Sequence, residues 1–106
     1  MTGQISKQAE ESFGKQDYKQ AIVHYTKVIE ANPKPESKLS EAYLKRGISY
    51  LKTEKFEEAL KDFDKAIELT PNLEQAYNQR GLAKANLGKQ EEAIKDFDKA
   101  IEINPK

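Results

Sequence analysis

The chain repeats one octapeptide, Lys61-Asp62-Phe63-Asp64-Lys65-Ala66-Ile67-Glu68, without change at residues 95–102. Four further matches share this offset of 34 residues: Ala42-Tyr43 with Ala76-Tyr77, Arg46-Gly47 with Arg80-Gly81, Glu57-Glu58-Ala59 with Glu91-Glu92-Ala93, and Pro71 with Pro105. Chance does not plausibly place five matches at one offset. The chain therefore contains an internal repeat, and its period falls in the range typical of helical repeat proteins.

A fainter copy precedes these two. It consists of Tyr18, Ala21, Ile22, Tyr25, Val28 and Ile29, which have the same internal spacing as Phe56, Ala59, Leu60, Phe63, Ala66 and Ile67. The first two copies are 38 residues apart, which places four extra residues in a connector rich in Pro and Lys, where added length costs little. We expect one domain, 1–106, with repeats at about 2–35, 40–73 and 74–106 and a connector at about 33–39.

The repeated spacing places six side chains along one face of an α-helix. Each repeat also contains an earlier helix, which we expect at about Ser37–Thr53 in repeat two and Leu73–Leu87 in repeat three. No window shows the two-residue alternation of a β-strand. The sequence thus predicts an all-α fold of three antiparallel helix pairs, each with a first and a second helix.

Several residues mark helix ends and close contacts. Asp17 and Asn72 are each followed three residues later by Gln, which is typical of a helix N-cap. Gly88 suits the left-handed residue that follows a helix. Gly47 and Gly81 lie within first helices, where Gly costs about 1 kcal/mol relative to Ala. They therefore predict a partner helix that passes very close.

Large residues should fill the space between the pairs. They are Tyr43, Phe63, Tyr77 and Phe97, and small residues such as Ala9, Ala59 and Ala93 should allow close packing. An aromatic cofactor box is the competing interpretation, but aromatic stripes at helical spacing are normally core, so we expect no cofactor.

This pattern resembles the tetratricopeptide repeat, with Ala-Tyr, Gly four residues after the Tyr, Ala-x-x-x-Phe-x-x-Ala and a closing Pro in each 34-residue unit. The resemblance implies an α-solenoid in which the pairs stack as a right-handed superhelix. It also implies a protein–protein interaction module whose first helices line a concave groove.

We expect that groove to bind a peptide or partner protein through Leu44, Lys45, Ile48, Leu51, Asn78, Gln79, Leu82 and Asn86. Apolar side chains would be buried by the partner, and amide side chains can bond its backbone. The alternative is that Leu44, Ile48 and Leu51 belong to the core between repeats.

Some members of this family bind the acidic C-termini of heat-shock chaperones through a clamp of Lys, Asn and Arg. The matching positions here are Ser6, Glu10, Lys45, Gln75 and Gln79, and all five depart from that pattern. Glu10 would repel a carboxylate. The sequence therefore disfavours acidic chaperone tails as the ligand.

Charge and composition exclude several other functions. Lys plus Arg and Asp plus Glu are equal at 18 each, so the basic excess of a nucleic-acid binder is missing. There is no Cys, and the single His24 has no metal-ligating companion, so we expect no metal site and no enzyme. No apolar run reaches membrane-spanning length and no targeting signal is visible, so we expect a cytoplasmic location and no membrane partner.

The outer faces of the second helices carry paired charges. Glu57 with Lys61 and Asp62 with Lys65 have the spacing of neighbours on one helix face. Their copies in repeat three have the same spacing, and His24 occupies the position of Asp62 in repeat one. We expect all of these side chains to face solvent.

The sequence stops at Asn104-Pro105-Lys106, directly after the last second helix, without the polar helix that usually covers the end of a repeat array. Two explanations remain open. The chain is a fragment of a longer array or multidomain protein, or its open end pairs with a second copy. The second explanation gives the alternative function, a self-assembly module.

Overall fold

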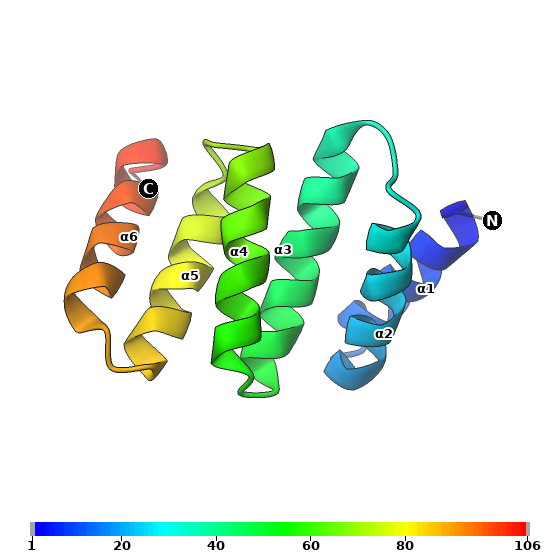
Figure 1. Ribbon diagram of the computed structural model, residues 1–106, viewed down its shortest axis with the longest axis horizontal. Coiled ribbons are helices and arrows are strands. Elements are labelled where there is room, and N and C mark those ends of the chain that lie inside the picture. Colours follow the sequence, from blue (N-terminus) through cyan, green and yellow to red (C-terminus); the bar gives the residue numbers. More distant parts are fainter. Residues whose placement is uncertain (1, 106) are drawn as a thin grey trace.

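The computed structural model describes residues 2–105, and the side chains of residues 4–105. This range contains no strand and six α-helices, namely α1 (Thr2–Gly14), α2 (Tyr18–Glu30), α3 (Glu36–Lys52), α4 (Phe56–Leu69), α5 (Glu74–Asn86) and α6 (Gln90–Ile103). Consecutive helices are antiparallel and form three hairpins in a row, with α1 and α6 at opposite ends (Figure 1). The predicted all-α fold of three helix pairs is confirmed.

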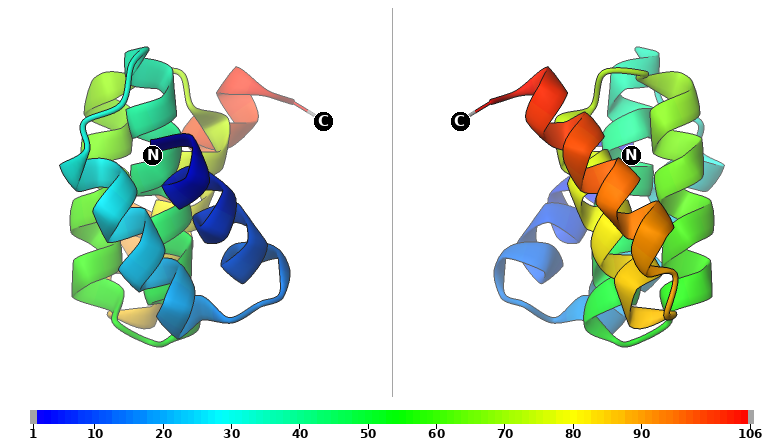
Figure 2. Two further views of the ribbon diagram at one scale, coloured as in Figure 1. Left: turned by 90° about the vertical axis from the view of Figure 1, so that its right-hand side faces the viewer. Right: turned by 90° about the vertical axis from the view of Figure 1, so that its left-hand side faces the viewer.

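The hairpins stack as a solenoid 42 Å long and 27 by 23 Å across. Each internal first helix packs against two second helices, so that α3 contacts both α4 and α2, and α5 contacts both α6 and α4. Viewed along the row, α6 is inclined to α4, which shows that successive hairpins are turned relative to one another (Figure 2). None of the helices in the described range has both the length and the apolarity that crossing a membrane requires.

Two of the three predicted helix ends are confirmed. The Asp17 side chain caps α2 by accepting a hydrogen bond from the backbone N–H of Gln20 at 3.3 Å. Gly88 follows α5 with φ +82°, in the left-handed region. The prediction for Asn72 is wrong, because α5 begins at Glu74. Its N-cap residue is Leu73, whose side chain cannot accept a hydrogen bond.

The close approach at the mid-helix glycines is confirmed, and the approaching group is an aromatic ring. A Cβ atom placed on Gly47 would lie 2.6 Å from Cε1 of Phe63, inside van der Waals contact. Gly81 has the same relation to Phe97. Each phenylalanine therefore packs within its own hairpin, against the first helix, and Phe63 also belongs to the core between repeats two and three. A larger residue at either glycine would have to displace the ring.

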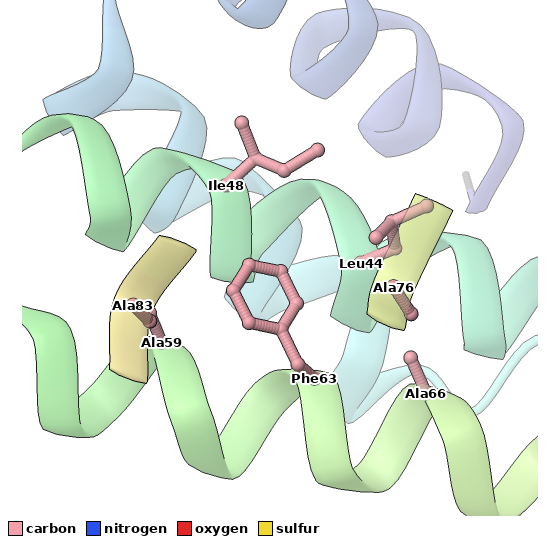
Figure 3. Close-up of a cluster of buried hydrophobic side chains, with 7 residues drawn as sticks. All are labelled: Leu44, Ile48, Ala59, Phe63, Ala66, Ala76 and Ala83. Carbon is pink, nitrogen blue, oxygen red and sulfur yellow. The ribbon is translucent and has the colours of Figure 1, made fainter. Parts of the chain in front are cut away.

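The core has two parts, one at each junction between repeats. The first junction is filled by Ala9, Ala21, Tyr25, Val28 and Ala42. The second is filled by Leu44, Ile48, Ala59, Phe63, Ala66, Ala76 and Ala83. In the second cluster the Phe63 ring lies between α3 and α4, and Leu44 lies beside Ala76 of α5 (Figure 3).

Buried ion pairs join the two helices of repeats two and three. Arg46 donates two hydrogen bonds to the Asp62 carboxylate, at 2.8 and 2.7 Å. Arg80 contacts Asp96 in the same way, at 2.9 and 2.8 Å. Both aspartates are buried, so the prediction that they face solvent is wrong. Two-pronged arginine–carboxylate contacts of this kind fix the geometry of the pair as well as its charge.

The same arginines also reach the preceding repeat. Nη1 of Arg46 donates to Oγ1 of Thr26 at 3.2 Å, and Nη1 of Arg80 donates to Oδ1 of Asp64 at 2.8 Å. Each arginine therefore connects three helices. The lysines expected to pair with the buried aspartates contact glutamates instead, as Lys65 does with Glu68 at 3.3 Å.

The two buried aspartates differ in their electrostatic surroundings. Burial raises the pKa of Asp62, and the single cation Arg46 lowers it by less. Burial also opposes ionisation of Asp96, but Arg80 and Lys84 together lower its pKa below the usual value. Asp62 is the more deeply buried of the two, and Asp96 has a second cation, because Lys84, 3.2 Å away, occupies the position at which repeat two has a tyrosine.

Candidate binding surface

Two of the predicted groove residues are part of the core. Leu44 and Ile48 are only 4% and 5% exposed, and they pack with Phe63 and the alanines of α5. Their assignment to a contact surface is therefore wrong. The physical reason is that both side chains belong to the core cluster of the second junction, where Ala76 of α5 is small enough to lie beside Leu44 (Figure 3). The alternative interpretation, a core between repeats, holds for these two residues.

The other predicted groove residues remain at least partly accessible. Lys45, Leu51 and Gln79 are half-buried, while Asn78, Leu82 and Asn86 are exposed, with Leu82 at 41%. The structure thus leaves three exposed members on α5. All three lie on one face of the helix, because they are spaced four residues apart.

Two of these accessible side chains have internal partners. Nδ2 of Asn86 donates to the Leu82 carbonyl oxygen at 2.8 Å. The side-chain oxygen of Asn86 can then accept a hydrogen bond from a ligand. Nζ of Lys45 lies 4.6 Å from the centre of the Phe13 ring, a cation–π contact between α3 and α1. Lys45 therefore contributes to the junction of repeats one and two.

A hollow also lies at a place where the sequence predicts no ligand. A cavity of about 690 Å³ opens at the junction of repeats one and two, between α1, α2, the connector and α3. Its walls include Ser6, Glu10, Tyr25, Lys34 and Glu41. From the sequence, Ser6 and Glu10 are predicted only to differ from the residues of a chaperone clamp. The signal that could have found the cavity is that these two polar residues hold the positions of Leu44 and Ile48 one repeat later.

A smaller hollow of about 370 Å³ lies at the second junction. It is bordered by Glu41 and Lys45 of α3, by Leu73 in the turn before α5, and by Gln75 of α5. The two hollows share Glu41, so together they follow the first helices from α1 to α5.

Tyr25 has the most unusual electrostatic environment on this surface. Burial, and then the charges of Glu10 and Glu41, raise the pKa of Tyr25 to about 12. Each effect disfavours the phenolate, because an anion loses hydration on burial and is repelled by neighbouring carboxylates. The hydroxyl of Tyr25 consequently stays protonated across the physiological range.

Among the described residues, no metal-binding cluster accompanies these side chains. Within residues 4–105, no group of three His, Asp or Glu side chains lies close enough to hold a metal ion. His24 was expected to face solvent, but it is half-buried, and its Nδ1 lies 2.9 Å from Oγ of Ser12. This contact joins α1 and α2. Ser12 and His24 hold the positions that Lys84 and Asp96 hold in repeat three, where an ion pair joins the two helices.

Known proteins share both the sequence pattern and the fold. Residues 7–35, 40–73 and 74–106 each match a family model of the tetratricopeptide repeat. Hsp70-Hsp90 organizing protein 1 of Glycine max is 43% identical over 61 residues, which is 58% of this chain and 10% of that protein. A UDP-N-acetylglucosamine–peptide N-acetylglucosaminyltransferase of Giardia intestinalis is 40% identical over 57 residues, 54% of this chain and 4% of that protein. The chain thus spans a tenth or less of these relatives.

Solved structures give the same result over nearly the whole chain. The first tetratricopeptide domain of Spaghetti (RPAP3), bound to the HSP90 peptide SRMEEVD, superposes with a TM-score of 0.88 and 30% identity. That match covers 98% of this chain and 79% of the other. The TPR2B domain of yeast Sti1 gives a TM-score of 0.86 with 28% identity, over 97% of this chain and 79% of the other. The chain belongs to the tetratricopeptide repeat family.

Proposed function

We propose that the chain is a non-catalytic scaffold that holds a peptide of a partner protein along its first helices. The observation that carries this proposal is the accessible face of α5, formed by Asn78, Leu82 and Asn86. Two hollows lined by residues of α1, α3 and the start of α5 add accessible surface along the other first helices. Amide groups on this face can bond a peptide backbone, and Leu82 offers apolar area. The Spaghetti domain, which holds a heptapeptide, supports the idea that a domain of this shape binds peptides.

The first experiment identifies ligands by selection from a displayed peptide library on the wild-type domain. Affinities of the selected peptides are then measured for Leu82→Glu and for Lys95→Glu, a control on exposed surface of α6. We expect Leu82→Glu to weaken binding about tenfold or more, because it places a charge on the apolar part of the site, and Lys95→Glu to have little effect. Equal affinities for both variants would contradict binding along α5.

We further propose that the ligand is not an acidic chaperone tail. Glu10 faces the hollow, and Ser6, Gln75 and Gln79 supply no positive charge where a carboxylate clamp requires it. Lys45 is the one cation at the five clamp positions, and it lies over Phe13. Carboxylates bind well only where charged donors offset their loss of hydration.

The peptide SRMEEVD tests this point directly. We expect no micromolar binding to the wild-type domain, because no clamp holds the C-terminal carboxylates of the peptide. A variant carrying Ser6→Lys, Glu10→Asn, Lys45→Asn, Gln75→Lys and Gln79→Arg rebuilds the clamp and should bind the peptide with an affinity on the order of micromolar. Micromolar binding by the wild type, or none by the rebuilt variant, would contradict the proposed reason for exclusion.

A second candidate function rests on the open end at α6. Ile94 and Ile101 are 57% and 59% exposed, whereas the matching Leu60 and Ile67 of repeat two are packed against the core of the second junction. The face that repeat two buries is therefore open in repeat three, which favours association with a further repeat or a second copy. Sedimentation velocity over a wide concentration range tests self-association. We expect a mass increase that Ile94→Glu with Ile101→Glu abolishes, and a constant monomer mass would rule this function out.

A further inference from the structure

The cavity at the first junction exists because two apolar residues of the repeat are replaced by polar ones. Leu44 and Ile48 close the second junction, but the matching residues of α1 are Ser6 and Glu10, which line the cavity. The connector between α2 and α3 forms another wall, and it contains the four extra residues of this repeat. At about 690 Å³, the cavity falls within the range of sites that bind small ligands or peptide segments.

Tyr25 places at this cavity a hydroxyl that has no hydrogen-bond partner among the described residues. The residue is only 5% exposed, and its ring is held edge-on by Phe13 at a centroid distance of 6.3 Å. Within the described part of the chain, the Tyr25 hydroxyl forms no hydrogen bond, yet no fully buried side-chain oxygen or nitrogen lacks a partner. The hydroxyl must therefore keep contact with the cavity that Tyr25 lines. A polar group fixed in this way favours a ligand that can complete its hydrogen bonds.

The charges around the cavity are separated by sign. Glu10 of α1 and Glu41 of α3 both line the cavity, and both act on Tyr25 strongly enough to raise its pKa. Lys34 and Lys38 line the side formed by the connector and the start of α3. Among the described residues, none of these four side chains forms an ion pair with another residue. The site is therefore acidic around Tyr25 and basic at the connector.

We propose that this cavity receives a lysine or arginine side chain of the bound peptide. The cationic group lies between Glu10 and Glu41 and donates a hydrogen bond to the Tyr25 hydroxyl. Its aliphatic stem lies along Val28 and Ala42, which also line the cavity. This inference rests on the proposed function and specifies the ligand chemistry of one part of the same surface.

Other ligands fit the cavity less well. A carboxylate near Tyr25 would meet two glutamates, and each would repel it. A divalent cation would find only two carboxylates, on different helices, and no third His, Asp or Glu side chain close enough among the described residues. Lys34 and Lys38 favour an acidic group next to the basic residue, so the preferred peptide contains both.

The test compares two peptides that differ in one charge. The first is acetyl-Ala-Arg-Ser-Glu-Ala-amide, and the second has citrulline, the neutral isostere of arginine, in place of Arg. Both are titrated into the ¹⁵N-labelled domain and followed by amide chemical shifts. For the arginine peptide we expect saturable shifts at residues 6–10, 25 and 38–42, with a dissociation constant on the order of 1 mM. The citrulline peptide should bind at least about fivefold more weakly, because charged hydrogen bonds are the stronger ones.

Matched variants identify the groups responsible. Glu10→Gln with Glu41→Gln keeps the shape of the cavity and should abolish the difference between the two peptides. Leu82→Glu, on α5, should preserve it. Equal binding of both peptides, or no shifts at the cavity with either, would overturn the assignment of a basic side chain.

The proposed function would fail differently. A library selection that yields no peptide able to shift the amides of α1, α3 or α5 would contradict the scaffold itself. Selected peptides that bind α5 and contain no basic residue would support the proposed scaffold function. They would overturn only the inference that the cavity receives a basic side chain.

Discussion

The two junctions between neighbouring repeats share one helix arrangement but are filled in opposite ways. At the second junction, Leu44 and Ile48 of α3 are only 4% and 5% exposed and belong to the core cluster, although Leu44 also lines the hollow of about 370 Å³. At the first, Ser6 and Glu10 occupy the same two positions of α1, and a cavity of about 690 Å³ remains beside Tyr25. The helix arrangement alone therefore does not decide whether a junction is core or site. Two side chains on the first helix and the longer connector distinguish the two junctions.

This division of roles has an energetic basis. Burying a leucine or isoleucine side chain stabilises a protein by about 1.5–3 kcal/mol, so the second junction contributes strongly to the cohesion of the array. The first junction lacks that contribution. It is held instead by Tyr25, Val28 and the small alanines around them, and by Lys45 over the Phe13 ring. An open, less cohesive junction is a natural place for a ligand, because groups there are not already satisfied by the fold.

The largest effect is expected from breaking the closed junction. Ile48→Glu places a carboxylate in a site that is 5% exposed and surrounded by apolar side chains. We expect a loss of about 4 kcal/mol or more, enough to unfold the second and third repeats. Urea denaturation followed by circular dichroism measures it.

Leu82→Glu is the matched control, since Leu82 is the same position one repeat later and is 41% exposed. Its stability should stay within about 0.5 kcal/mol of the wild type. If Ile48→Glu were equally harmless, Ile48 would have to be accessible, and the original assignment of this residue to the groove would stand.

Converting the open junction into a closed one should have a smaller and opposite effect. Ser6→Leu with Glu10→Ile copies the second junction onto the first. We expect a gain of about 2 kcal/mol from apolar burial, less than full burial would provide because the longer connector keeps part of the cavity open. The urea midpoint should rise, and the arginine peptide should lose its preference over the citrulline peptide. A fall in stability would show that the connector, and not the two side chains, keeps the junction apart.

The sequence was sufficient for the fold but only partly sufficient for the surface. The helices and the close contact at Gly47 follow from the repeat, because periodicity and a mid-helix glycine report on local geometry. The burial of Ile48 does not follow in the same way. An apolar stripe on one helix does not show whether a neighbouring helix or solvent lies opposite. The small Ala76 and Ala83 of the next repeat were the available signal.

The buried ion pairs were missed for a related reason. Reading charges along one helix pairs Asp62 with Lys65, its neighbour on the same face. The structure pairs it with Arg46, sixteen residues earlier and on the facing helix. Both Arg and Asp recur at the repeat offset, so the pair was visible as two repeated residues, but their contact depends on how the hairpin closes. Long-range contacts of this kind are what single-helix patterns omit.

The burial of Tyr25 at the open junction should make the stability of the fold depend on pH in alkaline solution. In the folded state Tyr25 has a pKa of about 12, against about 10 for an unfolded tyrosine, so the folded state holds this proton more tightly. That contribution is fully present below pH 10 and is lost as the pH rises through 12. At pH 11 we expect a loss of about 1 kcal/mol that Tyr25→Phe removes.

Urea midpoints at pH 9 and pH 11 measure this loss, with Tyr77→Phe in the last repeat as the control. Glu10→Gln should reduce the loss only in part, because burial is the largest cause of the raised pKa. An identical pH dependence in wild type and Tyr25→Phe would show that the hydroxyl is not confined as described.

The smallest expected effect concerns the turns within the hairpins, where repeat three differs from the other two. The residue in the left-handed region is Gly88 in repeat three but Gln16 in repeat one and Glu54 in repeat two, with φ values of 61° and 62°. A non-glycine residue pays a steric penalty there, partly offset by the greater freedom that glycine has in the unfolded chain. We expect Gln16→Gly and Glu54→Gly each to stabilise the fold by about 0.5–1 kcal/mol, and Gly88→Ala to destabilise it by a similar amount. Thermal midpoints of the three single variants provide the measurement. Because Gln16 lies in the repeat with the open junction, a smaller gain there than at Glu54 would indicate that repeat one unfolds before the rest of the array.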